Sequence, residues 1–332
     1  MKAIGYQRAL PINDPESLQD IELPKPVASG KDLLVKVGAI SVNPVDTKVR
    51  MRAEPAEGEY KVLGWDAVGT VEQVGDECSL FKPGDRVWYA GDLTRSGTNA
   101  EFQLVDQRIV SKAPETLSDA EAAALPLTTL TAWEMLFDRL EVDATEPKSI
   151  LIIGAAGGVG SIMVQLVKRL TKLKVIGTAS RPETAEWLKK LGADQVINHR
   201  NPLSEELGEE SCVDYVVSLN GTEQHMEEVV KVIKPQGKFG LIDDPQEFNI
   251  LPLKQKSISL HWEFMYTRSL FETADIIEQH KILAAVAGMI DEVLLQTTVG
   301  ERFGKINAEN LKRAHGLLES QKAKGKIVLE GF

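Results

Sequence analysis

A run of small residues at 154–160, Gly-Ala-Ala-Gly-Gly-Val-Gly, constrains the fold more than any other segment. It follows an apolar run at 149–153 and precedes a helical run at 161–170, so we expect a strand, a tight turn and a helix. Small side chains let a backbone approach a pyrophosphate, and the helix N-terminus supplies N–H groups and a positive dipole end. The spacing matches Gly-x-Gly-x-x-Gly with Ala in the first place, which predicts a dinucleotide site at Ala155, Gly157, Gly158, Val159 and Gly160. The alternative is a β–α turn without a ligand.

Strands and helices alternate from residue 149 to residue 265, which predicts an α/β domain with a doubly wound parallel sheet. Before about residue 120, short β-branched or aromatic runs separated by Gly, Pro and Asp favour a barrel or a sandwich. A capping-box pattern from Ser118 to Glu121 marks the change, and a helix is expected at 131–137. The parallel strands are expected at 149–153, 174–178, 195–197, 214–217, 238–242 and 258–262.

Composition excludes several classes of partner and site. The chain has 38 Lys and Arg against 49 Asp and Glu, a net charge of −11, so we expect neither nucleic acid nor an anionic membrane as a partner. No apolar run approaches the roughly 18 residues of a membrane span, and charges near the N-terminus argue against a signal peptide, so a cytoplasmic protein is expected. The chain has two Cys and five His, and the first 198 residues contain one Cys and no His. No zinc site is therefore expected.

The end of the second parallel strand indicates which dinucleotide is preferred. An NAD site usually has an acidic residue there to hold the ribose 2′-hydroxyl, but residues 178–182 read Thr-Ala-Ser-Arg-Pro. A hydroxyl and a guanidinium suit a 2′-phosphate, so Ser180 and Arg181 favour NADPH. The alternative is that Arg181 is a solvated residue of the first helical turn.

Six segments besides the glycine turn carry a family resemblance: 41–47, 64–71, 83–87, 125–134, 261–265 and 325–329. Taken together they resemble the medium-chain dehydrogenase/reductase superfamily, in its quinone-oxidoreductase branch and its zinc-type alcohol dehydrogenase-like subgroup. The resemblance implies a GroES-like β-rich catalytic domain at 1–123, a Rossmann NADPH-binding domain at 124–266 that interrupts it, and a C-terminal return at 267–332. It also implies homodimers joined at the last Rossmann strand.

The resemblance also assigns expected roles to single residues. Where zinc alcohol dehydrogenases place a Cys and a His on the catalytic ion, this chain has Asn43 and Trp65. Asn43 is expected to stabilise a developing anion, and Asp66 and Tyr60 are the candidate proton donors, with a purely structural role as the alternative for both. His199 is expected near the 2′-phosphate, unless it is an ordinary surface histidine. The remaining expected cofactor contacts are Lys48, Asn220, Gly240, Leu241 and Ile242.

The expected reaction is hydride transfer from NADPH to a small electrophile, a quinone or an α,β-unsaturated carbonyl. A conjugated acceptor delocalises the arriving charge and needs no zinc as Lewis acid. The alternatives are a zinc-type alcohol dehydrogenase and a non-catalytic NADPH-binding protein.

Overall fold

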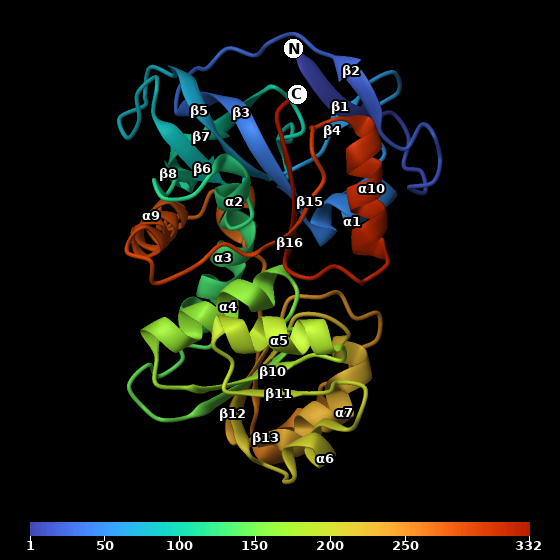
Figure 1. The fold of residues 1–332 in the computed structure, drawn as a ribbon, viewed down its shortest axis with the longest axis vertical. Coiled ribbons are helices and arrows are strands. Elements are labelled where there is room, and N and C mark those ends of the chain that lie inside the picture. The colour runs from blue at the N-terminus through green and yellow to red at the C-terminus, as the bar shows by residue number, and fades with distance from the viewer. The chain divides into compact units, whose positions relative to one another are not determined.

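A computed structural model describes residues 1–332 and divides them into two compact units. Unit 1 comprises Met1–Leu130 and Tyr266–Phe332, and unit 2 comprises Thr131–Met265. The sequence analysis expects the domain boundaries after residues 123 and 266, and the two units divide after residues 130 and 265. Figure 1 shows the β-rich unit 1, which contains both chain ends, and the α/β unit 2.

Unit 1 is built around one long strand. The elements assigned to it are β1 (Lys2–Tyr6), β2 (Gln19–Glu22), β3 (Asp32–Val42), α1 (Pro44–Arg52), β4 (Lys61–Val62), β5 (Asp66–Val74), β6 (Arg86–Tyr89), β7 (Phe102–Asp106), η1 (Gln107–Ile109), β8 (Val110–Lys112), α2 (Asp119–Ala123), α3 (Pro126–Trp133, which runs on into unit 2), α8 (Thr267–Leu270), α9 (Glu278–Asp291), β15 (Val299–Arg302), α10 (Ala308–Glu319) and β16 (Lys326–Glu330).

Strand β3 has three partners, and this pairing brings the C-terminal segment to the N-terminal part of the chain. β5 pairs along most of one edge, while β7 and β16 share the other edge. Ile327 of β16 lies opposite Val42, at the end of β3. The first residues of β16 are therefore held next to the first residues of α1.

Unit 2 is a six-stranded parallel sheet with the order β11-β10-β9-β12-β13-β14. Its elements are η2 (Glu134–Arg139), β9 (Ser149–Ile153), α4 (Gly158–Leu170), β10 (Lys174–Thr178), α5 (Pro182–Leu191), β11 (Gln195–Ile197), α6 (Leu203–Leu207), β12 (Val213–Ser218), α7 (Thr222–Val232), β13 (Ile233–Leu241), η3 (Leu251–Lys256) and β14 (Ser259–Trp262). From β9 the chain continues through β10 to β11 at one edge of the sheet, and then crosses back to β12 on the other side of β9. The switch point, where such sheets bind nucleotides, lies beyond the carboxyl ends of β9 and β12.

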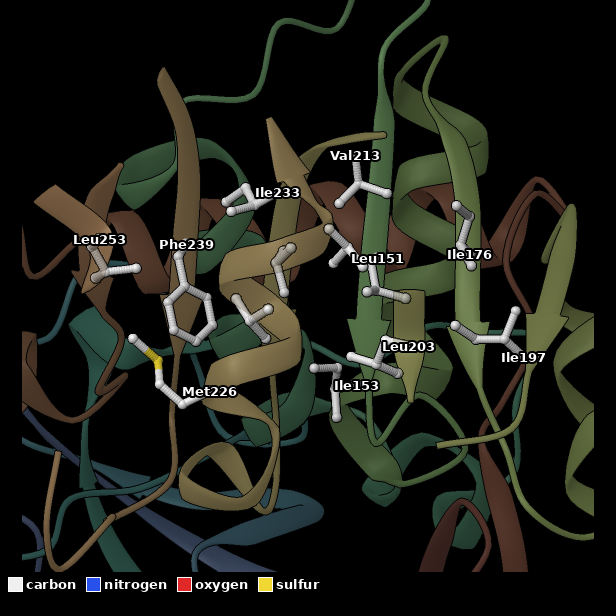
Figure 2. Close-up of a cluster of buried hydrophobic side chains, with 13 residues drawn as sticks. Leu151, Ile153, Ile176, Ile197, Leu203, Val213, Met226, Ile233, Phe239 and Leu253 are labelled. Carbon is white, nitrogen blue, oxygen red and sulfur yellow. The ribbon is translucent and has the colours of Figure 1, made fainter. Parts of the chain in front are cut away.

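A buried apolar cluster holds one face of this sheet against α6 and α7 (Figure 2). Leu151 and Phe239 come from central strands, Leu203 and Val229 from the two helices, and none of these four side chains is exposed. Burial of each such side chain contributes about 1.5–3 kcal/mol, so the cluster fixes the strand ends at which a ligand would bind.

Most elements of unit 2 lie where the sequence predicted them, with two differences. β13 begins at Ile233, several residues early, and its pairing with β12 contains an irregularity near Val213. The helix expected at 131–137 begins at Pro126 as α3 and continues as the π-helix η2. Proline suits the first turn of a helix, because that position needs no N–H donor.

The expected capping box of α2 is present, with Ser118 and Glu121 bonded reciprocally. None of the helices is both long and apolar enough to cross a membrane.

Candidate functional site

The glycine turn of unit 2 leaves room for a ligand at one position and is closed by packing at another. Gly157 is the N-cap of α4 with φ −75°. A Cβ on Gly157 would meet only the Gly154 carbonyl oxygen, at 3.4 Å. A Cβ on Gly160 would lie 2.3 Å from the carbonyl oxygen of buried Ala155. The absent side chain of Gly160 therefore allows helix and strand to touch, whereas that of Gly157 leaves an open approach to the N–H groups of the first turn.

Side chains from neighbouring elements hold this turn in place. The Gly154 N–H donates to Thr178 Oγ1 at the end of β10 (3.1 Å). The Ser161 hydroxyl donates to the Gly157 carbonyl (2.7 Å), and Trp187 Nε1 of α5 donates to the Ser161 oxygen (2.9 Å). The turn is thus ordered before any cofactor arrives, which lowers the entropic cost of binding.

The tip of β10 carries an ion pair that the sequence reasoning overlooked. Arg181 is the N-cap of α5, and its Nε lies 3.2 Å from Glu183 Oε1. The two side chains are 36% and 57% exposed. No acid stands at residues 178–182, but a carboxylate follows one residue later and contacts the same guanidinium. Ser180 is adjacent and partly buried.

Two histidine rings meet beyond the end of β11. His199 packs edge-on against His225 of α7, with ring centroids 6.2 Å apart. Burial lowers the pKa of both imidazoles, so both are neutral near pH 7. Nδ1 of His199 is buried without a hydrogen-bond partner. Such an atom costs free energy until a ligand or a water satisfies it, which fits a polar group of a nucleotide at this end of the sheet.

The ends of β12 and β13 are joined by a small polar network. The Thr222 N–H donates to Asp243 Oδ2 (2.9 Å), the Thr222 hydroxyl donates to Asp243 Oδ1, and the Ser218 hydroxyl donates to Thr222 Oγ1 (2.8 Å). Asn220 lies next to the glycine turn, since a Cβ on Gly154 would be 3.6 Å from Asn220 Cβ. The network fixes the loop in which Asn220 is expected to contact the cofactor.

The other expected contacts lie at the end of β13. Gly240 is in tight contact with Met135, whose Sδ is 2.3 Å from the place of a Cβ, so packing alone explains this glycine. Leu241 is fully buried, and the N–H of the partly exposed Ile242 donates to the Ser218 carbonyl (3.3 Å).

Unit 1 brings Asn43 and Asp66 together in a buried polar centre. Asn43 follows β3 directly and is the N-cap of α1, and Asp66 is the first residue of β5. Asn43 Nδ2 donates to Asp66 Oδ2 (2.8 Å), and the Leu127 N–H donates to Asp66 Oδ1 (2.7 Å). The sequence reasoning missed a third member, Lys326 of β16, whose Nζ donates to Asp66 Oδ2 (3.0 Å) and to Asn43 Oδ1. Asp66 accepts three hydrogen bonds from N–H donors, the pattern of an ionised carboxylate.

Two proton-holding groups adjoin this centre, and the sequence reasoning nominated neither. Asp46 Oδ2 accepts from the Asn43 N–H (2.8 Å), and burial raises the pKa of Asp46 to about 7, with Lys326 opposing the shift. Burial raises the pKa of Tyr266 well above 10, and Asp46 and Asp66 add to the shift. The Tyr266 ring stands edge-on to that of Trp65, with centroids 6.2 Å apart. Tyr266 therefore carries its proton at neutral pH, whereas Asp46 loses its proton as the pH rises through about 7.

The other nominated residues of unit 1 lie outside this centre. Tyr60 is 37% exposed and precedes β4, where its Cβ lies near Gly5 of β1. Lys48 is partly exposed on α1. No hydrogen bond joins Tyr60 to Asn43 or Asp66 in the structure.

The donors at the positions of the family's catalytic zinc do not suit the metal. The Trp65 indole has only an N–H to offer, and it donates that to the Asp92 carbonyl (3.1 Å). Asn43 Oδ1 accepts from Lys326. No group of three His, Cys, Asp or Glu side chains is arranged to hold a metal ion. A catalytic zinc requires three such protein ligands, so the residues present do not fit it.

Comparison with known proteins places the chain among dehydrogenases. Residues 29–115 match the family model of the alcohol dehydrogenase GroES-like domain, and residues 191–329 match that of the zinc-binding dehydrogenase. A zinc-type alcohol dehydrogenase-like protein of Staphylococcus aureus (strain COL) is 43% identical over 336 residues, which cover 99% of each chain.

Solved structures of other proteins also match this chain over nearly its full length. A Rhizobium etli CFN 42 protein, whose description proposes a zinc-dependent alcohol dehydrogenase, is 52% identical with a TM-score of 0.96, covering 100% of this chain and 98% of that chain. The Escherichia coli quinone oxidoreductase complexed with NADPH is 26% identical with a TM-score of 0.84, covering 99% of this chain and 100% of that one.

Proposed function

Because this chain belongs to the medium-chain dehydrogenase/reductase superfamily and is an oxidoreductase of that family, we propose that it transfers hydride from NADPH to a quinone or an α,β-unsaturated carbonyl without zinc. The observation that carries the proposal is the donor set of unit 1. The positions that would bind zinc hold an indole N–H and an amide oxygen already bonded to an ammonium.

The cofactor preference rests on unit 2. We assign the pyrophosphate to the N–H groups of Gly158, Val159 and Gly160, which the bare Gly157 leaves accessible. The 2′-phosphate is assigned to Ser180 and Arg181, at the end of β10. Glu183 weakens this preference, because its carboxylate lies 3.2 Å from Arg181 Nε and competes with the phosphate for the guanidinium.

The preference for a conjugated acceptor follows from the missing Lewis acid. NADPH supplies the hydride when it is bound. An isolated ketone needs its oxygen polarised as charge arrives, and this chain has no metal site for that purpose. A quinone or an enone spreads the charge over several atoms, so the demand on the protein is smaller.

The contacts in unit 1 redistribute the catalytic roles. Both amide hydrogens of Asn43 face acceptors, Asp66 Oδ2 at 2.8 Å and the Ser41 carbonyl at 3.4 Å. We therefore assign Asn43 to ordering the start of α1, and Asp66 to anchoring the centre, rather than to binding an anion or donating a proton. Asp46, whose pKa is raised to about 7, replaces Tyr60 and Asp66 as the favoured proton donor, whereas burial makes Tyr266 a weak acid.

The proposed assembly is a homodimer through β14. This strand ends the sheet order and pairs with β13 on one side only. Trp262 and Phe264 beside it are 49% and 48% exposed. An apolar edge strand of this kind favours pairing with a second copy.

A matched pair of acceptors tests the function. NADPH carrying deuterium at the transferred position is incubated with the protein and either cyclohexenone or cyclohexanone, and the products are analysed by mass spectrometry and NMR. We expect deuterium at the β-carbon of the saturated product from the enone, and no turnover of the ketone. Equal reduction of both would point to the zinc-type alcohol dehydrogenase alternative. Tight NADPH binding without turnover of any enone or quinone would favour the non-catalytic alternative.

A further inference from the structure

Lys326 is a buried ammonium whose three hydrogens are all used within the protein. Its side chain is 4% exposed, and it stands at the first position of β16. Nζ donates to the Val42 carbonyl (3.2 Å), to Asp66 Oδ2 (3.0 Å) and to Asn43 Oδ1. An ammonium has three donors, so none remains for a substrate. Lys326 therefore acts through its neighbours rather than on a reacting atom.

The neighbours depend on this one cation. Asp66 is fully buried, and Lys326 is the only cationic side chain that pairs with it. Asn43 Oδ1 accepts a hydrogen bond from Lys326 Nζ, while Asn43 Nδ2 donates to Asp66 and the Asn43 backbone N–H donates to Asp46. The direct contact of Nζ with Asp66 Oδ2 is thus the one ion pair that holds this carboxylate in the buried centre.

We propose that the Lys326 ammonium is the resident cation of the Asn43–Asp66 centre and takes the place of a metal ion in ordering it. Three oxygen atoms surround Nζ as ligands surround an ion: two come from consecutive residues at the junction of β3 and α1, and the third comes from the start of β5. A metal would have to displace Nζ to reach Asn43 Oδ1 or Asp66 Oδ2. The inference goes beyond the proposed function, since it holds whichever acceptor is reduced.

The first test removes the charge and keeps the volume. Lys326→Met leaves Asp66 buried without its partner, and we expect the melting temperature to fall by roughly 6–20 °C. Removing both charges in Lys326→Met/Asp66→Asn should recover most of that loss, because a neutral pair needs no solvation. Lys305→Met, an exposed lysine of the same unit, is the control and should melt like the wild type.

The second test asks whether the centre needs the positive charge of Lys326 or only the volume of its side chain. Lys326→Ala lacks the three methylenes and the ammonium that propylammonium carries. We expect millimolar propylammonium to raise the melting temperature of this variant, and 1-propanol, which has the same length without the charge, to have no such effect. The wild type should respond to neither.

Several outcomes would overturn the proposal. One is a Lys326→Met protein that melts like the wild type, and another is equal rescue of Lys326→Ala by the amine and the alcohol. If Lys326→Met fails to fold, the double variant decides the matter: a folded double variant supports the proposal, and an unfolded one contradicts it. Zinc bound stoichiometrically to wild-type Asn43 or Asp66 would also contradict it.

Discussion

Arg181 and Glu183 provide a paired test of cofactor choice, because they place opposite charges side by side at the proposed 2′-phosphate site. NADPH and NADH differ only in that phosphate. A charge-assisted hydrogen bond contributes about 1.5–3 kcal/mol, and the lower half applies here because the Arg181 side chain is 36% exposed. Arg181→Ala should therefore weaken NADPH binding about 10- to 30-fold and leave NADH nearly unchanged.

Glu183→Gln is the matched variant, and it should change NADPH binding in the opposite direction. It keeps the size of the side chain and removes the carboxylate that lies 3.2 Å from Arg181 Nε. Loss of a partly exposed opposing charge is worth about 0.2–1 kcal/mol, so NADPH should bind roughly 2- to 5-fold more tightly. Ser180→Asp should instead shift the preference toward NADH, since it repels the phosphate and accepts from a free 2′-hydroxyl.

Isothermal titration of each protein with both cofactors, at low and at high salt, measures these effects. Higher salt should weaken NADPH binding more than NADH binding, because only NADPH uses the extra charge. Equal affinity of the wild type for both cofactors would refute the assignment. Loss of both cofactors alike in Arg181→Ala would do the same and leave Arg181 as a solvated residue of the first turn of α5.

Three further expectations concern the turn, the buried acid and the sheet edge. Gly157→Val should abolish NADPH binding with an unchanged circular dichroism spectrum, whereas Gly160→Ala should lower the melting temperature, because its Cβ would lie 2.3 Å from a backbone oxygen. Burial raises the folded-state pKa of Asp46 to about 7, above its unfolded-state pKa near 4. The free energy of unfolding that protonated Asp46 contributes is therefore complete below pH 4 and is lost as the pH rises through 7. The free energy of unfolding is measured by denaturant titration for the wild type and for Asp46→Asn, and the difference between them should fall by roughly 2–3 kcal/mol from pH 5 to pH 8. His315, whose pKa is lowered to about 3 by burial, changes the stability in the opposite direction. It does so equally in both proteins, so its contribution cancels in the difference. Trp262→Arg should yield monomers by light scattering if β14 forms the dimer, and an unchanged mass would reject that edge.

The α/β unit could be predicted from the sequence because its determinants are local. The glycine spacing, the apolar run before it and the helix after it lie within residues 149–170, and each additional strand is a separate apolar run. The parallel order then follows from the crossover helices. The π-helix η2 could not be predicted, because no local pattern distinguishes it from the α-helix that it continues.

The polar centre of unit 1 could be predicted only in part, because its members meet through tertiary structure. Asp66 and Lys326 are 260 residues apart, and only the pairing of β16 with β3 brings them together. Lysine is rarely buried, so a lysine at the start of an apolar strand gives no local sign of a buried role. Glu183 was missed for a different reason: the tip was examined only to residue 182, while the first turn of α5 returns the next side chain to Arg181.

The central claim is that turnover needs NADPH and a conjugated acceptor but no zinc. The direct measurement is the rate of NADPH oxidation with 1,2-naphthoquinone or cyclohexenone by protein dialysed against a strong chelator, with zinc per chain determined on the same sample by atomic emission. We expect well under one zinc per chain and a rate equal to that of the undialysed protein. A rate that falls with the removed zinc and returns when zinc is added back would contradict the account.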